Sequence, residues 1–82
     1  MANQLWYAQQ QLYRQCLKSV RAQAELTQKE LASLLGKPQS YVSKYESGER
    51  KLDYLEVREI CKFCNVSISD FEEILVRAIA RL

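Results

Sequence analysis

Apolar residues recur at intervals of three and four along five stretches of the chain, a spacing that places side chains on one face of an α-helix. The first stretch spans about residues 4 to 23, where Leu12, Leu17 and Val20 stand among Gln, Arg and Lys. The last stretch follows Ser67 or Ser69, either of which suits a helix N-cap, and runs to the final residue. The pattern therefore predicts five helices joined by short loops.

Capping signals bound the second and third helices. Thr27 and Glu30 have the spacing of a capping box, in which each side chain binds a free backbone amide at the helix start. Gly36 ends this helix after two turns, because glycine adopts the left-handed conformation that other residues resist. Pro38 suits the first turn of a third helix, roughly residues 38 to 46, which the following Ser-Gly pair closes.

The fourth helix begins at Asp53, with Glu56 three residues later, and Asn65 is expected to end it in a left-handed conformation. With only 2 Gly and 1 Pro among 82 residues, the composition favours helix throughout. A chain of this length forms a single core, so residues 1–82 are expected to be one all-α domain.

Several kinds of chemistry are excluded by composition. The absence of His removes the most common general base and the most common metal ligand. Three Cys without a framework spacing favour reduced thiols and a cytoplasmic protein, and neither a membrane span nor a signal peptide is expected. Cys61 and Cys64 form a CxxC pair, but zinc needs more ligands than the chain offers. We expect this pair to pack in the core. For the protein as a whole we expect no catalytic site, no cofactor and no metal.

Basic residues are concentrated in the first part of the chain. The net charge is only +2, yet residues 1 to 51 carry eight basic and four acidic side chains. Residues 52 to 82 carry four basic and six acidic side chains. The first part of the chain is therefore basic and the last part is mildly acidic.

The second and third helices carry the most informative pattern. Two short helices joined by a tight connection with a glycine describe a helix-turn-helix. Ala32 stands where the two helices approach most closely and only a small side chain fits, Gly36 supplies the turn, and Val42 anchors the second helix to the core. A small residue, a glycine and a β-branched residue at these offsets indicate a helix-turn-helix.

With these residues the chain resembles the Cro and phage-repressor type of helix-turn-helix proteins, also called XRE-like. The matching positions are Arg21, Leu26-Thr27-Gln28, Glu30-Leu31-Ala32, Gly36, Gln39-Ser40, Val42-Ser43, Glu46-Ser47-Gly48, Ile60-Cys61 and Val66-Ser67. The resemblance implies a five-helix, repressor-like domain whose helix-turn-helix is formed by helices 2 and 3. It also implies a sequence-specific transcriptional regulator that binds double-stranded DNA as a homodimer, with the third helix in the major groove.

Polar residues of the third helix are the expected base-reading group. Val42, Tyr45 and Glu46 share the face toward the domain with Pro38, one turn earlier. The opposite face carries Gln39, Ser40, Ser43 and Lys44. Gln pairs with adenine, Lys with guanine and Ser with either, so this face has base-reading chemistry.

Other residues are expected to contact phosphate or to hold the helices together. The resemblance implies that Gln28 binds a phosphate and that Arg21 and Glu46 form a partly buried ion pair. Tyr41 lies at the margin, near phosphate or a thymine methyl. Further phosphate candidates are Lys29, Lys37, Ser47, Arg50 and Lys51.

The C-terminal helix is the expected dimer contact. Its stripe comprises Phe71, Ile74, Leu75, Ala78, Ile79 and Leu82. In the other interpretation, Ile79 and Leu82 pack on the extended first helix. A different class of function also stays open, a protein-interaction or antitoxin-like module without DNA readout. Its partner would bind Trp6, Tyr7, Tyr13 and the C-terminal helix.

Overall fold

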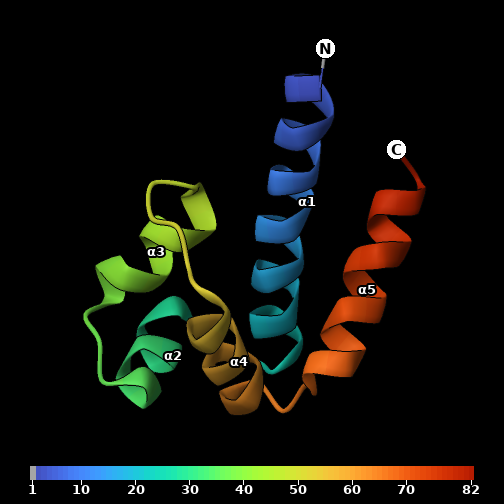
Figure 1. Ribbon diagram of the computed structural model, residues 1–82. Helices are drawn as coiled ribbons and strands as arrows, with labels where there is room; N and C mark the ends of the chain where they lie inside the picture. Colours follow the sequence, from blue (N-terminus) through green and yellow to red (C-terminus); the bar gives the residue numbers. More distant parts are fainter. Residues whose placement is uncertain (1) are drawn as a thin grey trace.

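The computed structural model describes residues 2–82, which form five α-helices (Figure 1). They are α1 Ala2–Gln23, α2 Gln28–Leu35, α3 Gln39–Ser47, α4 Tyr54–Phe63 and α5 Ile68–Ala80. The predicted all-α, five-helix architecture is confirmed. The predicted ends differ slightly, since α1 begins at Ala2 and α5 stops at Ala80 instead of continuing to the last residue.

Capping residues bound α2 where the sequence predicts, whereas the start of α3 differs from the prediction at one residue. Thr27 accepts a hydrogen bond from the Glu30 amide at 3.0 Å, and Glu30 accepts one from the Thr27 amide at 2.8 Å. Gly36 ends α2 in the left-handed conformation, with φ 69°. Pro38 is the N-cap of α3, not a residue of its first turn, and it is exposed. The expectation that Pro38 faces the domain is therefore wrong, because an extended N-cap lies outside the helical face.

The later helices also follow their local sequence signals. Asp53 and Glu56 form a second capping box at the start of α4. Ser67, not Ser69, caps α5 by accepting a hydrogen bond from the Asp70 amide at 3.0 Å. Asn65 has φ 60°, the left-handed conformation expected of it after α4.

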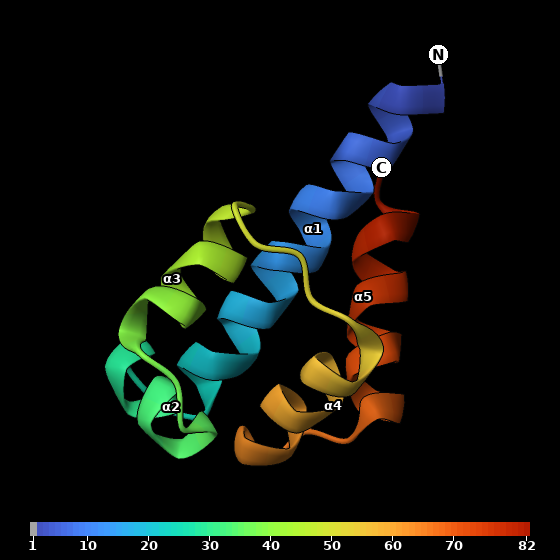
Figure 2. The ribbon, with the colours of Figure 1, turned by 60° about the vertical axis from the view of Figure 1, so that its left-hand side comes forward.

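α1 forms the centre of the molecule, between the α2–α3 pair and α5 (Figures 1 and 2). α2 packs against α3 and α4, while α5 packs mainly along α1. The core draws one or more side chains from every helix: Cys16, Leu17, Val20, Leu31, Ala32, Val42, Tyr45, Val57, Ile60, Cys61, Cys64 and Phe71. The core holds α3 against α1 through Val42 and Tyr45, and this leaves the opposite face of α3 in solvent.

The three cysteines are free thiols in this core. Burial raises the pKa of the Cys64 thiol to about 11, so the thiol stays protonated at neutral pH. The expectation that Cys61 and Cys64 pack as core residues is confirmed. Within residues 2–82, no group of three His, Cys, Asp or Glu side chains converges on a metal position. None of the described helices combines the length and apolarity that crossing a membrane requires.

Candidate nucleic-acid interface

The turn between α2 and α3 has the close packing that the motif predicts. Ala32 is 2% exposed and Val42 is fully buried. The Lys37 amide donates to the Ala32 carbonyl at 2.9 Å, and this bond closes the turn behind Gly36. A larger side chain at position 32 would force the two helices apart, because both helices pack directly at this point.

α3 presents its polar residues on the side away from the core. Gln39, Ser40 and Lys44 are exposed. Ser43 differs from the prediction, since it is half-buried and its hydroxyl donates to the Ser40 carbonyl at 3.2 Å. Its position three residues after Ser40 makes this internal bond available, so Ser43 offers only its remaining acceptor capacity to a ligand.

One hydrogen-bonded cluster fastens α3 to the rest of the domain. The Arg21 guanidinium donates to both Glu46 carboxylate oxygens, at 2.7 and 3.1 Å, and to the Leu26 carbonyl at 2.8 Å. The Gln28 side-chain amide donates to Glu46 Oε1 at 3.0 Å. Gln28, expected to be free for a phosphate, thus bridges α2 to α3. Its carboxamide nitrogen has one remaining hydrogen for another acceptor.

A second cluster surrounds Tyr41 at the other side of α3. The Tyr41 hydroxyl donates to Glu56 Oε2 at 2.9 Å, and Arg50 Nη2 donates to the same oxygen at 2.8 Å. Lys37 Nζ and the Arg50 guanidinium carbon lie 5.5 and 4.8 Å from the centre of the Tyr41 ring, within cation–π range. Burial and the bond to Glu56 raise the pKa of Tyr41 to about 12.

This cluster changes two expectations. The Tyr41 hydroxyl is already bonded to Glu56, so it does not point to a free phosphate-binding position. Arg50, expected to contact phosphate, is paired with Glu56 instead. Hydrogen bonds from the Asp53 amide and from Arg50 lower the pKa of Glu56 to about 2. Glu56 carried only a capping signal in the sequence, and nothing there indicated that it would reach the loop after α3.

The remaining cationic candidates are solvated. The exposed residues are Lys29, Lys37, Lys44 and Lys51, and no ion pair found within residues 2–82 includes them. Ser47 is exposed too, but its hydroxyl donates to the Lys44 carbonyl at 3.0 Å. The helix-turn-helix thus carries several positive charges that carboxylates do not neutralise, as a phosphate backbone requires of its partner.

The C-terminal stripe divides between core and surface. Phe71 is 5% exposed and meets the Tyr13 ring edge to face, at 6.4 Å between centroids. Phe71 is therefore a core residue, and its assignment to a dimer contact is wrong. Leu75, Ala78 and Ile79 are half-buried, whereas Leu82 is exposed, as is Ile74 at the edge of the stripe. The other interpretation, packing on α1, fits the half-buried Ile79 but is wrong for Leu82, which is exposed.

Comparisons with known proteins agree with this geometry. The helix-turn-helix family HTH_3 matches residues 17–71, which include the motif and most of the core. No curated protein matches the chain. Among solved structures, an XRE-family like protein from Pseudomonas syringae pv. tomato str. DC3000 superposes with a TM-score of 0.85, at 35% sequence identity and with 94% of each chain covered. The chain therefore belongs to the XRE-like family of helix-turn-helix proteins.

Proposed function

We propose that this protein is a sequence-specific transcriptional regulator that places α3 in the major groove of DNA. The observation that carries the proposal is the two-sided character of α3. Val42 and Tyr45 hold one face in the core, while Gln39, Ser40 and Lys44 are exposed on the other. These three side chains supply hydrogen-bonding groups for adenine and guanine edges.

Contacts to the DNA backbone would set the position of α3. The capping box binds the Thr27 and Glu30 amides, so the Gln28 and Lys29 amides are the ones left for a phosphate at the start of α2. Lys37 precedes α3 and Lys51 follows it, and both are exposed. Phosphate contacts of this kind orient the protein without reading sequence, so specificity falls to the exposed residues of α3.

We propose further that two copies bind a two-fold operator. A single short recognition helix reads few base pairs, and a second copy doubles the contact. The α5 face that carries Ile74 and Ala78, together with Leu82 after the end of the helix, supports this proposal, because Ile74 and Leu82 expose apolar surface to solvent. Sedimentation of the free protein at high micromolar concentration tests it, and a monomer there would contradict it.

Selection of bound sequences from random DNA tests the assignment of the recognition face. Lys44→Ala and Gln39→Ala should each weaken binding by about 1 to 3 kcal/mol and relax the preference at one base position. Arg77→Ala is the matched control, because Arg77 is an exposed cation on α5, away from α3. Sequence preference that survives both changes on α3 would contradict the assignment.

The salt dependence of binding separates this function from a protein-interaction module. A DNA reader with several phosphate contacts loses affinity steeply as salt rises. Trp6 and Tyr7 are exposed, and such aromatic side chains suit a surface that binds a protein partner. A domain that shows no salt-dependent binding to any selected DNA would favour that second class.

A further inference from the structure

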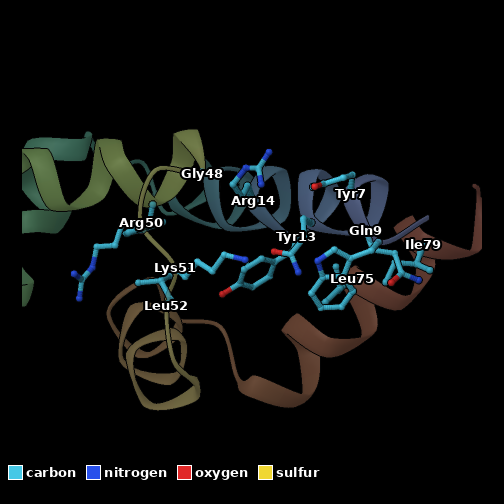
Figure 3. Close-up of a pocket in the computed structure, with 13 residues that line it drawn as sticks. Tyr7, Gln9, Tyr13, Arg14, Gly48, Arg50, Lys51, Leu52, Leu75 and Ile79 are labelled. Atoms are coloured by element: carbon cyan, nitrogen blue, oxygen red, sulfur yellow. The ribbon is translucent and has the colours of Figure 1, made fainter. Parts of the chain in front are cut away.

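A cavity that opens to solvent lies away from the recognition face, between α1, the loop after α3, and α5 (Figure 3). Its volume is about 570 Å³, within the range of pockets that hold small organic molecules. Its apolar wall consists of Trp6, Tyr7, Tyr13, Leu52, Leu75 and Ile79. The cavity thus has room for an apolar or aromatic body and the side chains to surround it.

The charges around this cavity have one sign. Arg14, Arg50 and Lys51 line it, and no Asp or Glu does. Arg50 extends away from the other labelled side chains in Figure 3 and pairs with Glu56, so its charge is already neutralised. Lys51 extends toward Tyr13 in the same view. Neither Arg14 nor Lys51 belongs to an ion pair found within residues 2–82, so two cations remain for a ligand.

We propose that this cavity binds a small organic anion, with an apolar, preferably aromatic body against Trp6 and Tyr13 and a carboxylate toward Arg14 and Lys51. A neutral apolar ligand would leave these cations without a partner, and a cationic ligand would be repelled by them. Either of these cations can give a carboxylate a charge-assisted hydrogen bond. The chemistry of the wall therefore selects an amphipathic anion.

The site touches the DNA-reading helix, so its occupancy would affect that helix. Tyr45 and Gly48, at the end of α3, belong to the cavity wall together with Lys51 and Leu52 of the loop. The Arg14 guanidinium packs on Gly48, with its carbon 2.9 Å from the position a Cβ would take there. An anion that draws Arg14 toward itself would shift this contact. This regulatory role rests on the proposed DNA binding, whereas the ligand site does not.

Trp6 provides a direct readout, because it is the single tryptophan of the chain and lines the cavity. Its emission can be followed during titration with phenylbutyrate, phenylbutanol and phenylbutylamine, which share one apolar body and differ in charge. We expect a saturable change with phenylbutyrate and about fivefold weaker binding of the alcohol, with the amine weaker still. Equal affinities for the three probes, or tighter binding of the amine, would overturn the proposal.

Variants of the chain provide a second test. Lys51→Gln should weaken phenylbutyrate binding about threefold to fivefold and leave phenylbutanol binding unchanged. Lys62→Gln, at an exposed lysine outside the cavity wall, is the matched control and should change neither. Ile79→Asp should weaken the binding of phenylbutyrate and leave the binding of phenylbutylamine unchanged. Urea unfolding of each variant verifies the fold, and an unchanged preference for the anion in both cavity variants would overturn the site.

DNA affinity measured with and without saturating phenylbutyrate tests the regulatory role. We expect a change of at least about threefold, which Ile79→Asp reduces at the same probe concentration. An unchanged affinity would overturn the coupling. The titration with phenylbutyrate followed by Trp6 emission needs no DNA, so it tests the ligand site independently. Failure of DNA binding is therefore distinguishable from failure of the site. A Trp6 emission that changes with protein concentration alone would show that a second copy covers the cavity, against the proposal.

Discussion

The Glu46 carboxylate accepts two hydrogen bonds from the Arg21 guanidinium, at 2.7 and 3.1 Å, and thereby ties α3 to the end of α1. Both side chains are largely removed from solvent, at 12% and 4% exposure for Arg21 and Glu46. Arg21 also donates to the Leu26 carbonyl, and Gln28 donates to Glu46. The ion pair and the bond from Gln28 therefore fix the orientation of α3 relative to α1, to the loop after α1 and to α2.

Glu46→Ala should destabilise the domain by about 3 kcal/mol or more, because it leaves the Arg21 charge largely buried without its partner. Equilibrium urea unfolding measures this loss. Glu73→Ala is the control, since Glu73 forms an exposed ion pair with Arg77, and such a pair is worth less than about 1 kcal/mol. An unfolding curve of Glu46→Ala that coincides with that of Glu73→Ala would contradict the role of the pair.

Glu56→Gln should remove part of the stability of the domain above pH 4.5 and make little difference near pH 2. Hydrogen bonds from the Asp53 amide and from Arg50 lower the pKa of Glu56 from 4.5 to about 2 in the folded state. A carboxylate with a lowered folded pKa stabilises the fold above its unfolded pKa. That contribution is lost as the pH falls through the folded value.

Urea unfolding from neutral pH down to about pH 2 gives the difference in free energy between wild type and Glu56→Gln. The difference should shrink steadily over this acidic range. Glu59→Gln changes an exposed acidic residue of the same helix and is the matched control. A difference that stays constant across the range would show that the ionisation of Glu56 contributes nothing.

The helices and the helix-turn-helix could be predicted from sequence because their signals are local. Capping boxes, glycines and apolar spacing act within a few residues, so Thr27, Gly36 and Asp53 mark the boundaries correctly. Glu25 is an exception, since it takes φ 60° after α1 without a glycine or asparagine to signal it. Its amide and that of Leu26 bond to carbonyls in the last turn of α1, which accounts for the conformation.

The partners of the site residues were less predictable, because they depend on how distant segments pack. Gln28 lies 18 residues from Glu46, and Tyr41 lies 15 from Glu56. Nothing near Gln28 or Tyr41 in the sequence indicates that these side chains are already bonded. Phe71 shows the same limit, since helical periodicity places it on an apolar stripe without showing which part of the stripe α1 covers.

Gly48→Ala should destabilise the domain more than Gly36→Ala. Both glycines have a positive φ, 92° and 69°, which costs a residue with a Cβ about 1 to 2 kcal/mol. A Cβ at Gly36 meets open space, whereas one at Gly48 lies 2.9 Å from the guanidinium carbon of Arg14, the end of a flexible side chain that can move aside. The φ of Gly48 also lies further from the left-handed region around about +57° that residues with a Cβ occupy. Urea unfolding should therefore show the larger loss at Gly48, also in an Arg14→Ala background. Equal losses at both positions would contradict this conformational penalty.

Release of Arg50 from its ion pair should strengthen DNA binding and increase its dependence on salt. Arg50 donates to Glu56 at 2.8 Å, so a phosphate has to compete with this carboxylate. Glu56→Gln removes the competing charge, and one new phosphate contact should steepen the slope of log K against log salt by about 0.9. Arg50→Gln combined with Glu56→Gln should return the slope to the wild-type value, and Glu59→Gln should leave it unchanged. If Arg50→Gln alone lowers the slope by the same amount, Arg50 already contacts phosphate while Glu56 is in place. The ion pair then does not keep Arg50 away from the DNA.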